Sequence, residues 1–234
     1  MESEAMKKYK AQEAKRVEIN LRHLENGVEF VDLYTAYIEE EVEIGRGTVI
    51  GPCVTLKGNT VIGENCIIGQ NSRVENCRIA DGAEIQSSVL LDSSVGEETK
   101  VGPFAYVRPG SRVGAHCKVG DFVEIKNSAF GDGSKASHLT YIGDSDVGSG
   151  VNLGCGVVFV NYDGTNKYRS TVEDGAFIGC NSNLVSPVTV GAGAYIGAGS
   201  TVTEDVEADA LYVARARGVT KEGWVSRKGI LKKK

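Results

Sequence analysis

The chain has 234 residues, a net charge of −5 and an isoelectric point near 5.4, so it lacks the basic balance that binding to nucleic-acid phosphates requires. No stretch approaches the roughly 20 apolar residues of a membrane span, and the charged first residues contain no apolar signal segment. Gly is abundant, with 30 residues, whereas aromatic residues make up 7 % of the chain, which favours a narrow core without bulky rings. We therefore expect a cytoplasmic protein with no nucleic-acid or membrane partner.

The N-terminal residues 1–37 predict one helix followed by an extended segment. Good helix formers run from Lys7 to Leu24, and Asn26-Gly27 is a typical helix stop. The stretch from Val28 to Tyr37 is predicted to be extended and to lead into the rest of the chain.

From Ile38 the sequence repeats every six residues. Each unit has an aliphatic residue, then Gly or an acidic residue, and later a small or β-branched residue, as in Ile44-Gly45-Arg46-Gly47-Thr48-Val49. Such a short period predicts a solenoid. Six residues form one strand and a corner, and three units close a triangular turn, so that stacked turns pair about 4.8 Å apart. We predict an all-β parallel β-helix of about nine or ten turns over residues 38–207 and an irregular tail over residues 208–234.

The repeat is disturbed in several places. It slips by one residue between Val74 and Ile79 and again near Ser93, which a bulge at a corner would explain. Between Phe130 and Ile142 small and polar residues replace the aliphatic ones. Residues 160–171 are polar and interrupt the repeat altogether, and such interruptions usually form a loop on the binding face of a solenoid.

Three histidines are candidates for a general base. His23 lies on the predicted helix and His116 at a variable, solvent-facing position, so surface or packing roles are expected for both. His138 lies in a polar stretch where an aliphatic core residue would be more stable, and functional and structural roles are equally open for it. The wide spacing of the three residues argues against a zinc site, and we expect no metal.

Cysteine and cationic residues give weaker signals. The six cysteines contain no CxxC pair and no metal-ligand spacing, and several stand at the small-residue position of a repeat, so we expect reduced core or corner residues. Arg108, Lys126 and Lys167 lie on different turns, and stacking could bring them to one edge as a phosphate-binding group. Taken singly, each is better explained as an ordinary surface charge.

From Val101 to Trp224 the chain resembles the acetyltransferase half of a bacterial family of bifunctional enzymes, the glucosamine-1-phosphate N-acetyltransferases and N-acetylglucosamine-1-phosphate uridyltransferases. The repeats alone are shared by many acyltransferases, whereas the motifs around His138 and Asn161-Tyr162 at this mutual spacing are specific. Residues 15–38 also resemble the linker helix of that family. No uridyltransferase half precedes the repeats, so we expect no uridyltransferase activity. The resemblance rests on Val107-Arg108-Pro109-Gly110, Gly120-Asp121-Phe122-Val123-Glu124-Ile125-Lys126, Gly133-Ser134-Lys135-Ala136-Ser137-His138-Leu139-Thr140-Tyr141, Asn161-Tyr162-Asp163-Gly164-Thr165-Asn166-Lys167 and Lys221-Glu222-Gly223-Trp224.

This resemblance implies a left-handed parallel β-helix that works as a homotrimer with active sites between subunits. It makes His138 the general base that takes a proton from the amine of glucosamine-1-phosphate as this amine attacks the thioester of acetyl-CoA. The implied substrate-binding residues are Arg108, Lys126, Tyr141, Asn152, Glu124 and, reaching a neighbouring subunit, Lys167. The implied acetyl-CoA-binding residues are Cys155, Asn161, Tyr162, Cys180, Ala198 and Arg215.

Two positions depart from the family, which commonly has Ala in place of Cys155 and Ser in place of Cys180. Loss of the hydroxyl could weaken a hydrogen bond to the acetyl group by about 1 kcal/mol. A less favoured alternative makes Cys180 an acyl-accepting nucleophile. Two functional alternatives also stay open: an acetyltransferase for another amino sugar or nucleotide sugar, and a non-catalytic partner of a separate nucleotidyltransferase such as a uridyltransferase.

Overall fold

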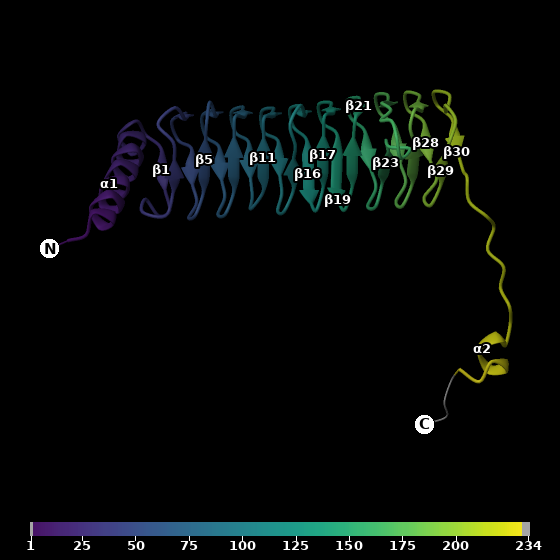
Figure 1. Cartoon of the computed structure of the whole chain (residues 1–234). Helices are drawn as coiled ribbons and strands as arrows, with labels where there is room; N and C mark the ends of the chain where they lie inside the picture. Colours follow the sequence, from purple (N-terminus) through teal and green to yellow (C-terminus); the bar gives the residue numbers. More distant parts are fainter. Residues whose placement is uncertain (1, 231–234) are drawn as a thin grey trace.

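The computed structural model describes residues 2–230 as a long β-helix with a helix at one end and an extended tail at the other (Figure 1). Helix α1 (Glu4–Glu25) begins after Ser3, whose hydroxyl accepts a hydrogen bond from the Met6 N–H at 3.2 Å. It ends at Asn26, and Gly27 follows with a φ of 92°. A residue at positive φ ends a helix at little cost when it is glycine, so the predicted stop is confirmed.

Short parallel strands form three sheets, A, B and C, which the chain visits in turn. Sheet A consists of β1 (Glu29–Phe30), β4 (Val49–Ile50), β7 (Ile67–Ile68), β10 (Glu84–Ile85), β13 (Lys100–Val101), β16 (Lys118–Asp121), β19 (Lys135–His138), β22 (Asn152–Leu153), β25 (Phe177–Ile178), β28 (Tyr195–Ile196) and β30 (Leu211–Tyr212). Sheet B consists of β2 (Tyr37–Ile38), β5 (Thr55–Lys57), β8 (Arg73–Glu75), β11 (Val89–Leu91), β14 (Tyr106–Val107), β17 (Glu124–Lys126), β20 (Tyr141–Gly143), β23 (Val158–Val160), β26 (Asn183–Val185) and β29 (Thr201–Val202). Sheet C consists of β3 (Glu43–Ile44), β6 (Val61–Ile62), β9 (Arg78–Ile79), β12 (Ser94–Val95), β15 (Arg112–Val113), β18 (Ala129–Phe130), β21 (Ser145–Val147), β24 (Ser170–Val172) and β27 (Thr189–Val190).

Each strand pairs with the strands one turn before and one turn after it, as β16 does with β13 and β19. With 11, 10 and 9 strands in its sheets, the molecule has about ten turns, and the predicted parallel β-helix is confirmed. The edges of this prism are named by the sheets that they join: the A–B, B–C and C–A corners.

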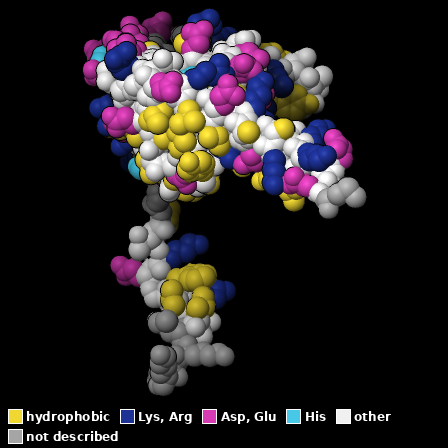
Figure 2. All heavy atoms as spheres, turned by 90° about the vertical axis from the view of Figure 1, so that its left-hand side faces the viewer, with side chains coloured by type: hydrophobic (Ala, Val, Ile, Leu, Met, Phe, Trp, Pro, Cys, Tyr) yellow, Lys and Arg dark blue, Asp and Glu magenta, His cyan; other side chains and the backbone are white. Residues whose placement is uncertain are grey.

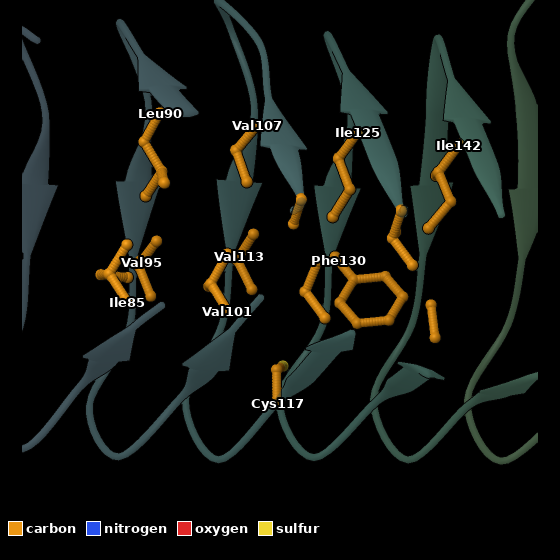
Figure 3. Close-up of a cluster of buried hydrophobic side chains, with 14 of the residues drawn as sticks. Ile85, Leu90, Val95, Val101, Val107, Val113, Cys117, Ile125, Phe130 and Ile142 are labelled. Atoms are coloured by element: carbon orange, nitrogen blue, oxygen red, sulfur yellow. The ribbon is translucent and has the colours of Figure 1, made fainter. Parts of the chain in front are cut away.

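The core is a narrow column of aliphatic side chains, one from each sheet on each turn. Ile85, Leu90 and Val95 face one another across one turn and stack on the corresponding residues of the next (Figure 3). Phe130 takes the sheet C position two turns further on and is 1 % exposed. Burial of apolar surface in this column stabilises the fold by about 25 cal/mol per Å². This burial explains why each repeat has an aliphatic residue at the inward-facing position.

The two slips of the repeat are corners that are one residue shorter, so the expected bulges are wrong. A bulge inserts a residue into a strand, whereas the aliphatic residues Val74 and Ile79 lie five positions apart instead of six. Asn76 and Asp92 turn these B–C corners with φ values of 51° and 41°. Asn and Asp enter this left-handed region more readily than other non-glycine residues, which explains their presence there.

The two ends of the prism lie within the segments expected to flank it. At the N-terminal end β1 pairs with β4, and Asn20 of α1 donates to the carbonyls of Leu33 and Ala36, which holds the helix against the first turn. After β30 the chain leaves the prism, and the tail with α2 (Trp224–Arg227) stands clear of it (Figure 2). Neither helix of residues 2–230 combines the length and apolar character of a membrane span.

Candidate active site

His138 lies at the end of β19, just before the A–B corner, beside a carboxylate from the preceding turn. The register pairs it with Asp121 of β16, and its Nδ1 lies 2.6 Å from the Asp121 Oδ1. The hydrogen bond from His138 lowers the pKa of Asp121, which is therefore a carboxylate at neutral pH. A carboxylate that accepts from Nδ1–H leaves Nε2 free to accept a proton. More than half of the His138 side chain, 56 %, is exposed, so a ligand can reach it.

Small residues continue the line of His138 along the A–B corner. The strand registers of sheet A place Cys155, Cys180 and Ala198 on the three following turns. Their backbones are linked through the next residue of each turn: the Asn181 N–H donates to the Cys155 carbonyl, and the Gly199 N–H to the Cys180 carbonyl, both at 2.8 Å. Beyond His138 this edge therefore presents small side chains at three successive predicted site positions.

Arg215 lies at the far end of the same edge. The chain returns there after β30, and Arg215 Nε donates to the Ala198 carbonyl at 2.8 Å. A guanidinium thus lies beside the last of the small residues.

The outer face of sheet B carries the cationic residues expected to bind phosphate. The registers of β14, β17 and β20 place Arg108 beside Lys126, and Glu124 beside Tyr141. Arg108 Nη1 donates to Glu124 Oε1 at 2.7 Å, and this hydrogen bond raises the pKa of Arg108. Both side chains are partly exposed, so the guanidinium keeps donors for a ligand.

Tyr141 lies across its own strand because Gly143 leaves room for the ring. A Cβ on Gly143 would lie 2.4 Å from the Tyr141 hydroxyl, so any other residue at this position would displace it. The pKa of Lys126 is raised first by its hydrogen bond to Asp144, and the charge interaction with Tyr141 adds to this rise. Tyr141 and Lys126 therefore approach each other on the outer face of sheet B.

Asn152 lies on a different face from the other predicted substrate-binding residues. It belongs to β22 of sheet A, between Lys135 and Phe177 on the neighbouring strands. Adjacent faces of a triangular prism point away from each other. Asn152 and Lys126 of one chain are therefore not brought together by the fold.

Residues 161–169, between β23 and β24, form a preformed loop at the B–C corner. Tyr162 and Lys167 form an antiparallel bridge, and Asp163 Oδ1 accepts hydrogen bonds from the N–H groups of Thr165 and Asn166 at 2.7 and 2.6 Å. Tyr162 is 53 % exposed. Lys167 is among the neighbours that influence the pKa of Lys126 of the same chain, behind the larger effect of Asp144. The loop therefore presents Tyr162 to solvent and keeps Lys167 near the phosphate-binding face.

Asp144 turns the B–C corner directly beneath this loop. Its Oδ2 accepts from Lys126 Nζ at 2.8 Å and from Asn161 Nδ2, and its Oδ1 accepts from Asn127 Nδ2 at 2.7 Å. Asn161 is only 6 % exposed, so its amide faces the carboxylate rather than solvent. The predicted acetyl-CoA-binding residues are therefore divided: Asn161 and Tyr162 lie at the B–C corner, and the small residues lie at the A–B corner.

The sequence did not reveal Asp121, Gly143 or Asp144 as site residues. Asp121 lies 17 residues before His138, and Asp144 lies 17 residues from both Asn127 and Asn161. A turn made of two six-residue units and one unit shortened by one residue at its corner gives this offset. Combining the slips of the repeat with the polar positions could therefore have found both carboxylates.

Two family models match parts of the chain: the GMPPB C-terminal domain over residues 34–111 and the bacterial transferase hexapeptide (six repeats) over residues 169–204. The bifunctional protein GlmU of Clostridium beijerinckii is 53 % identical over 222 residues, which are 95 % of this chain and 49 % of that protein. GlmU of Clostridioides difficile is 57 % identical over 219 residues, 94 % of this chain and 48 % of that protein. This chain is a relative of these GlmU proteins.

It corresponds to the C-terminal half of these proteins, so the resemblance found from the sequence is confirmed. The chain spans about half the length of the curated GlmU relatives that it matches. Among solved structures, a UDP-N-acetylglucosamine acyltransferase of Francisella novicida is 21 % identical, with a TM-score of 0.43 over 83 % of this chain and 72 % of that one. This distant likeness carries no argument about function.

The remaining histidines of this GlmU relative lie away from these groups. His23 is partly buried on α1, and burial lowers its pKa. His116 turns a C–A corner with its side chain 55 % exposed, beside Glu98 at 3.2 Å. Among residues 2–230 no three His, Cys, Asp or Glu side chains are grouped as metal ligands would be.

Proposed function

We propose that this chain transfers the acetyl group of acetyl-CoA to the amine of glucosamine-1-phosphate, giving N-acetylglucosamine-1-phosphate for the synthesis of UDP-N-acetylglucosamine, a cell-wall precursor. The observation that carries the proposal is the pairing of His138 with Asp121 at the head of an edge of small residues. A base is thereby oriented where a thioester would find little steric hindrance. The similarity to the C-terminal half of the GlmU proteins supports the choice of substrates.

In the proposed reaction the Asp121 carboxylate holds His138 with Nε2 facing the substrate amine. The amine attacks the thioester carbonyl and His138 Nε2 takes the proton that it loses. The tetrahedral intermediate then expels CoA thiolate, which can be protonated by the imidazolium. Each step conserves charge and protons, and Asp121 stabilises the imidazolium between them.

Arg108, Lys126 and Tyr141 would bind the sugar phosphate. A guanidinium and an ammonium on one face supply several N–H donors for phosphate oxygens, and the Tyr141 hydroxyl adds one more. Glu124, which holds Arg108 at 2.7 Å, would accept a hydrogen bond from a sugar hydroxyl with its free oxygen.

Acetyl-CoA would lie along the A–B corner, with its thioester against Cys155, Cys180 and Ala198 and its phosphates near Arg215. Backbone N–H groups at such small residues could stabilise the oxyanion of the intermediate. Asn161 and Tyr162 would complete this site. If Cys180 instead accepted the acetyl group, labelled acetyl would remain on the denatured protein.

A homotrimer accounts for the division of the predicted residues among separate faces. Asn152 on sheet A of one subunit would meet the sheet B face of the next, and Lys167 would reach the substrate of a neighbour. Trimers of His138→Ala refolded with trimers of Lys167→Ala would then regain activity. If activity is not regained, His138 and Lys167 belong to the site of the same subunit, and Lys167 acts beside Lys126 of its own chain. The compartment would be the cytoplasm, where a uridyltransferase could use the product.

Thiol release from acetyl-CoA tests the function directly. We expect release with glucosamine-1-phosphate and much less with glucosamine-6-phosphate or UDP-glucosamine, because the paired cations Arg108 and Lys126 suit a phosphate close to the amine. Preference for another amino sugar would change the substrate. Failure with all three would leave the non-catalytic alternative.

The role of the base is tested by His138→Ala, with His116→Ala as the matched control. The first change should lower turnover by about 10² or more, the usual contribution of a general base. The second should leave turnover near the wild-type value, because His116 lies on another corner. Near-normal activity of His138→Ala would contradict the proposed mechanism.

A further inference from the structure

Asp144 is the one described side chain that touches both a predicted phosphate-binding residue and a predicted acetyl-CoA-binding residue. Lys126 and Asn161 donate to the same oxygen, Oδ2, from the turns below and above it. A single carboxylate thus connects a residue expected to bind the sugar phosphate with a residue expected to bind acetyl-CoA.

The carboxylate is enclosed and its acceptor positions are engaged. The Asp144 side chain is 10 % exposed and that of Lys126 is 18 % exposed, so water has little access to the pair. Burial acts to raise the pKa of Asp144, but the hydrogen bonds from Lys126, Asn127 and Asn161 outweigh this effect and lower it. Asp144 is therefore ionised and directs all three donors at neutral pH.

The backbone of Asp144 is also connected to both sides. Its N–H donates to the Lys126 carbonyl at 2.9 Å, and its carbonyl accepts from the Ser170 N–H, where the chain returns from the loop, at 3.3 Å. With Asn161 held by the side chain, one residue fixes the first residue of the 161–169 loop and the residue that directly follows the loop. A shift of Asp144 would move the loop and Lys126 together.

We propose that Asp144 is a positioning residue that couples the sugar-phosphate site to the acetyl-CoA site. It holds the Lys126 ammonium through one N–H, which leaves the others for phosphate oxygens. Through Asn161 it also holds the base of the loop that would complete the acetyl-CoA site. This proposal rests on the proposed acetyl transfer, because it assigns the two ligands to the two ends of the network.

Asp144→Asn tests the coupling with little change to the backbone. Asp144 has a φ of 48°, which Asn also adopts readily. The amide carries no negative charge and has one oxygen for three donors, so its hold on Lys126 and Asn161 weakens. We expect the KM values for glucosamine-1-phosphate and for acetyl-CoA both to rise about tenfold, the scale of one hydrogen bond to a charged group.

Asn127→Gly is the matched control. It removes the third hydrogen bond to the same carboxylate, and glycine suits the φ of 47° at this position. Because Asn127 is assigned to neither ligand, both KM values should stay within about twofold of wild type. Equal effects of Asn127→Gly and Asp144→Asn would show that the network only supports the fold, and would overturn the proposal.

Double-mutant cycles separate positioning from charge. Asp144→Asn and Lys126→Met should be non-additive for the sugar phosphate KM, and Asp144→Asn and Asn161→Ala should be non-additive for the acetyl-CoA KM. A lower sugar phosphate KM in Asp144→Asn would mean that the carboxylate only repels phosphate, and additive cycles would mean no coupling; either result refutes the proposal. Calorimetry measures the binding of CoA to the wild type and to Asp144→Asn independently of turnover. A wild-type protein without activity would refute the proposed function, which is a different outcome from a failure of the coupling.

Discussion

Buried cysteines in this molecule make hydrogen bonds that hydroxyl groups make on other turns. Cys66 and Cys117 donate from Sγ to the carbonyls of Ala80 and Gly131 at 3.1 Å, and Ser134 donates from its hydroxyl to the Gly148 carbonyl at the same corner. A thiol is a weak donor of similar size, so the corner column accepts either group. This explains why cysteine occupies small-residue positions without any sign of disulfide or metal chemistry.

These environments predict which thiols react. Burial raises the pKa of Cys66, Cys77 and Cys117, so they carry little thiolate, whereas Cys53 and Cys180 are exposed. Brief alkylation of the folded protein at about pH 8, followed by peptide mass spectrometry, should label the two exposed cysteines and leave the three buried cysteines unlabelled. Acetyl-CoA should protect Cys180 and leave Cys53 reactive. Equal labelling of Cys180 with and without acetyl-CoA would remove it from the proposed thioester site.

Gly143 makes a second residue-level prediction. In Gly143→Ala the new methyl group would overlap the Tyr141 hydroxyl, which it would approach to 2.4 Å, so the ring must move. We expect the KM for the sugar phosphate to rise about tenfold, as for a lost hydrogen bond to a charged ligand. In a Tyr141→Ala background the same change should add nothing, because the clash is gone. A full additional effect there would show that Gly143 acts independently of Tyr141.

Some site residues can be predicted from the sequence and others cannot. His138 stood out because a polar stretch replaced an aliphatic position, which is visible without a structure. Asp121 looks like any exposed acidic residue until the register of β16 and β19 places it 2.6 Å from His138. Such partners depend on the length of every intervening corner, so a count along the whole repeat could pair them but no local pattern does.

At the level of elements, the 161–169 loop is fixed at its end by Arg169. Its guanidinium forms a two-point ion pair with Asp146 and donates to the carbonyls of Asn127 and Ser145 at 2.9 and 3.1 Å. The hydrogen bond to Asp146 raises the pKa of Arg169, and the same bond lowers that of Asp146. The loop is thereby attached to the turn beneath it before any ligand binds.

Arg169→Ala should therefore loosen the loop and leave the prism intact. We expect the KM for acetyl-CoA to rise by about tenfold, because Tyr162 loses its fixed position, and the loop to be cut faster in limited proteolysis. Arg169→Lys keeps one charged contact but not the two-point geometry, so an intermediate effect is expected. Unchanged proteolysis of the alanine variant would show that the turn around Asp163 suffices to hold the loop.

The sequence predicts some structural elements better than others, because some follow from local rules and others depend on contacts between turns. The helix stop and the inward aliphatic residues follow from local rules, so α1 and the stacking of the sheets could be expected. The short corners could not be distinguished from bulges, because both shift the repeat by one residue and only the strand pairing shows which has occurred. The loop was recognised by its polar sequence, but its attachment through Arg169 and Asp144 depends on contacts between turns.

For the whole molecule, the prism separates the predicted substrate residues by geometry. Lys126 lies on the outer face of sheet B, and Asn152 lies on the outer face of sheet A. The tail beyond β30, with Trp224 and Val225 exposed, stands clear of its own prism (Figure 2). Both features would be explained if a second copy of the chain supplied the missing contacts, as a cyclic trimer does.

Mixed trimers test this arrangement. If each site combines the sheet B face of one subunit with the sheet A face of the next, Asn152→Ala and Lys126→Met damage opposite halves of a site. Random assembly of equal amounts should then restore about one quarter of the sites, because half of the subunits bring an intact sheet B face and half of their neighbours an intact sheet A face. Each variant alone should lose most of its activity and remain trimeric in size-exclusion chromatography with light scattering. A mixture no more active than the average of the two variants would place both residues in the site of one chain.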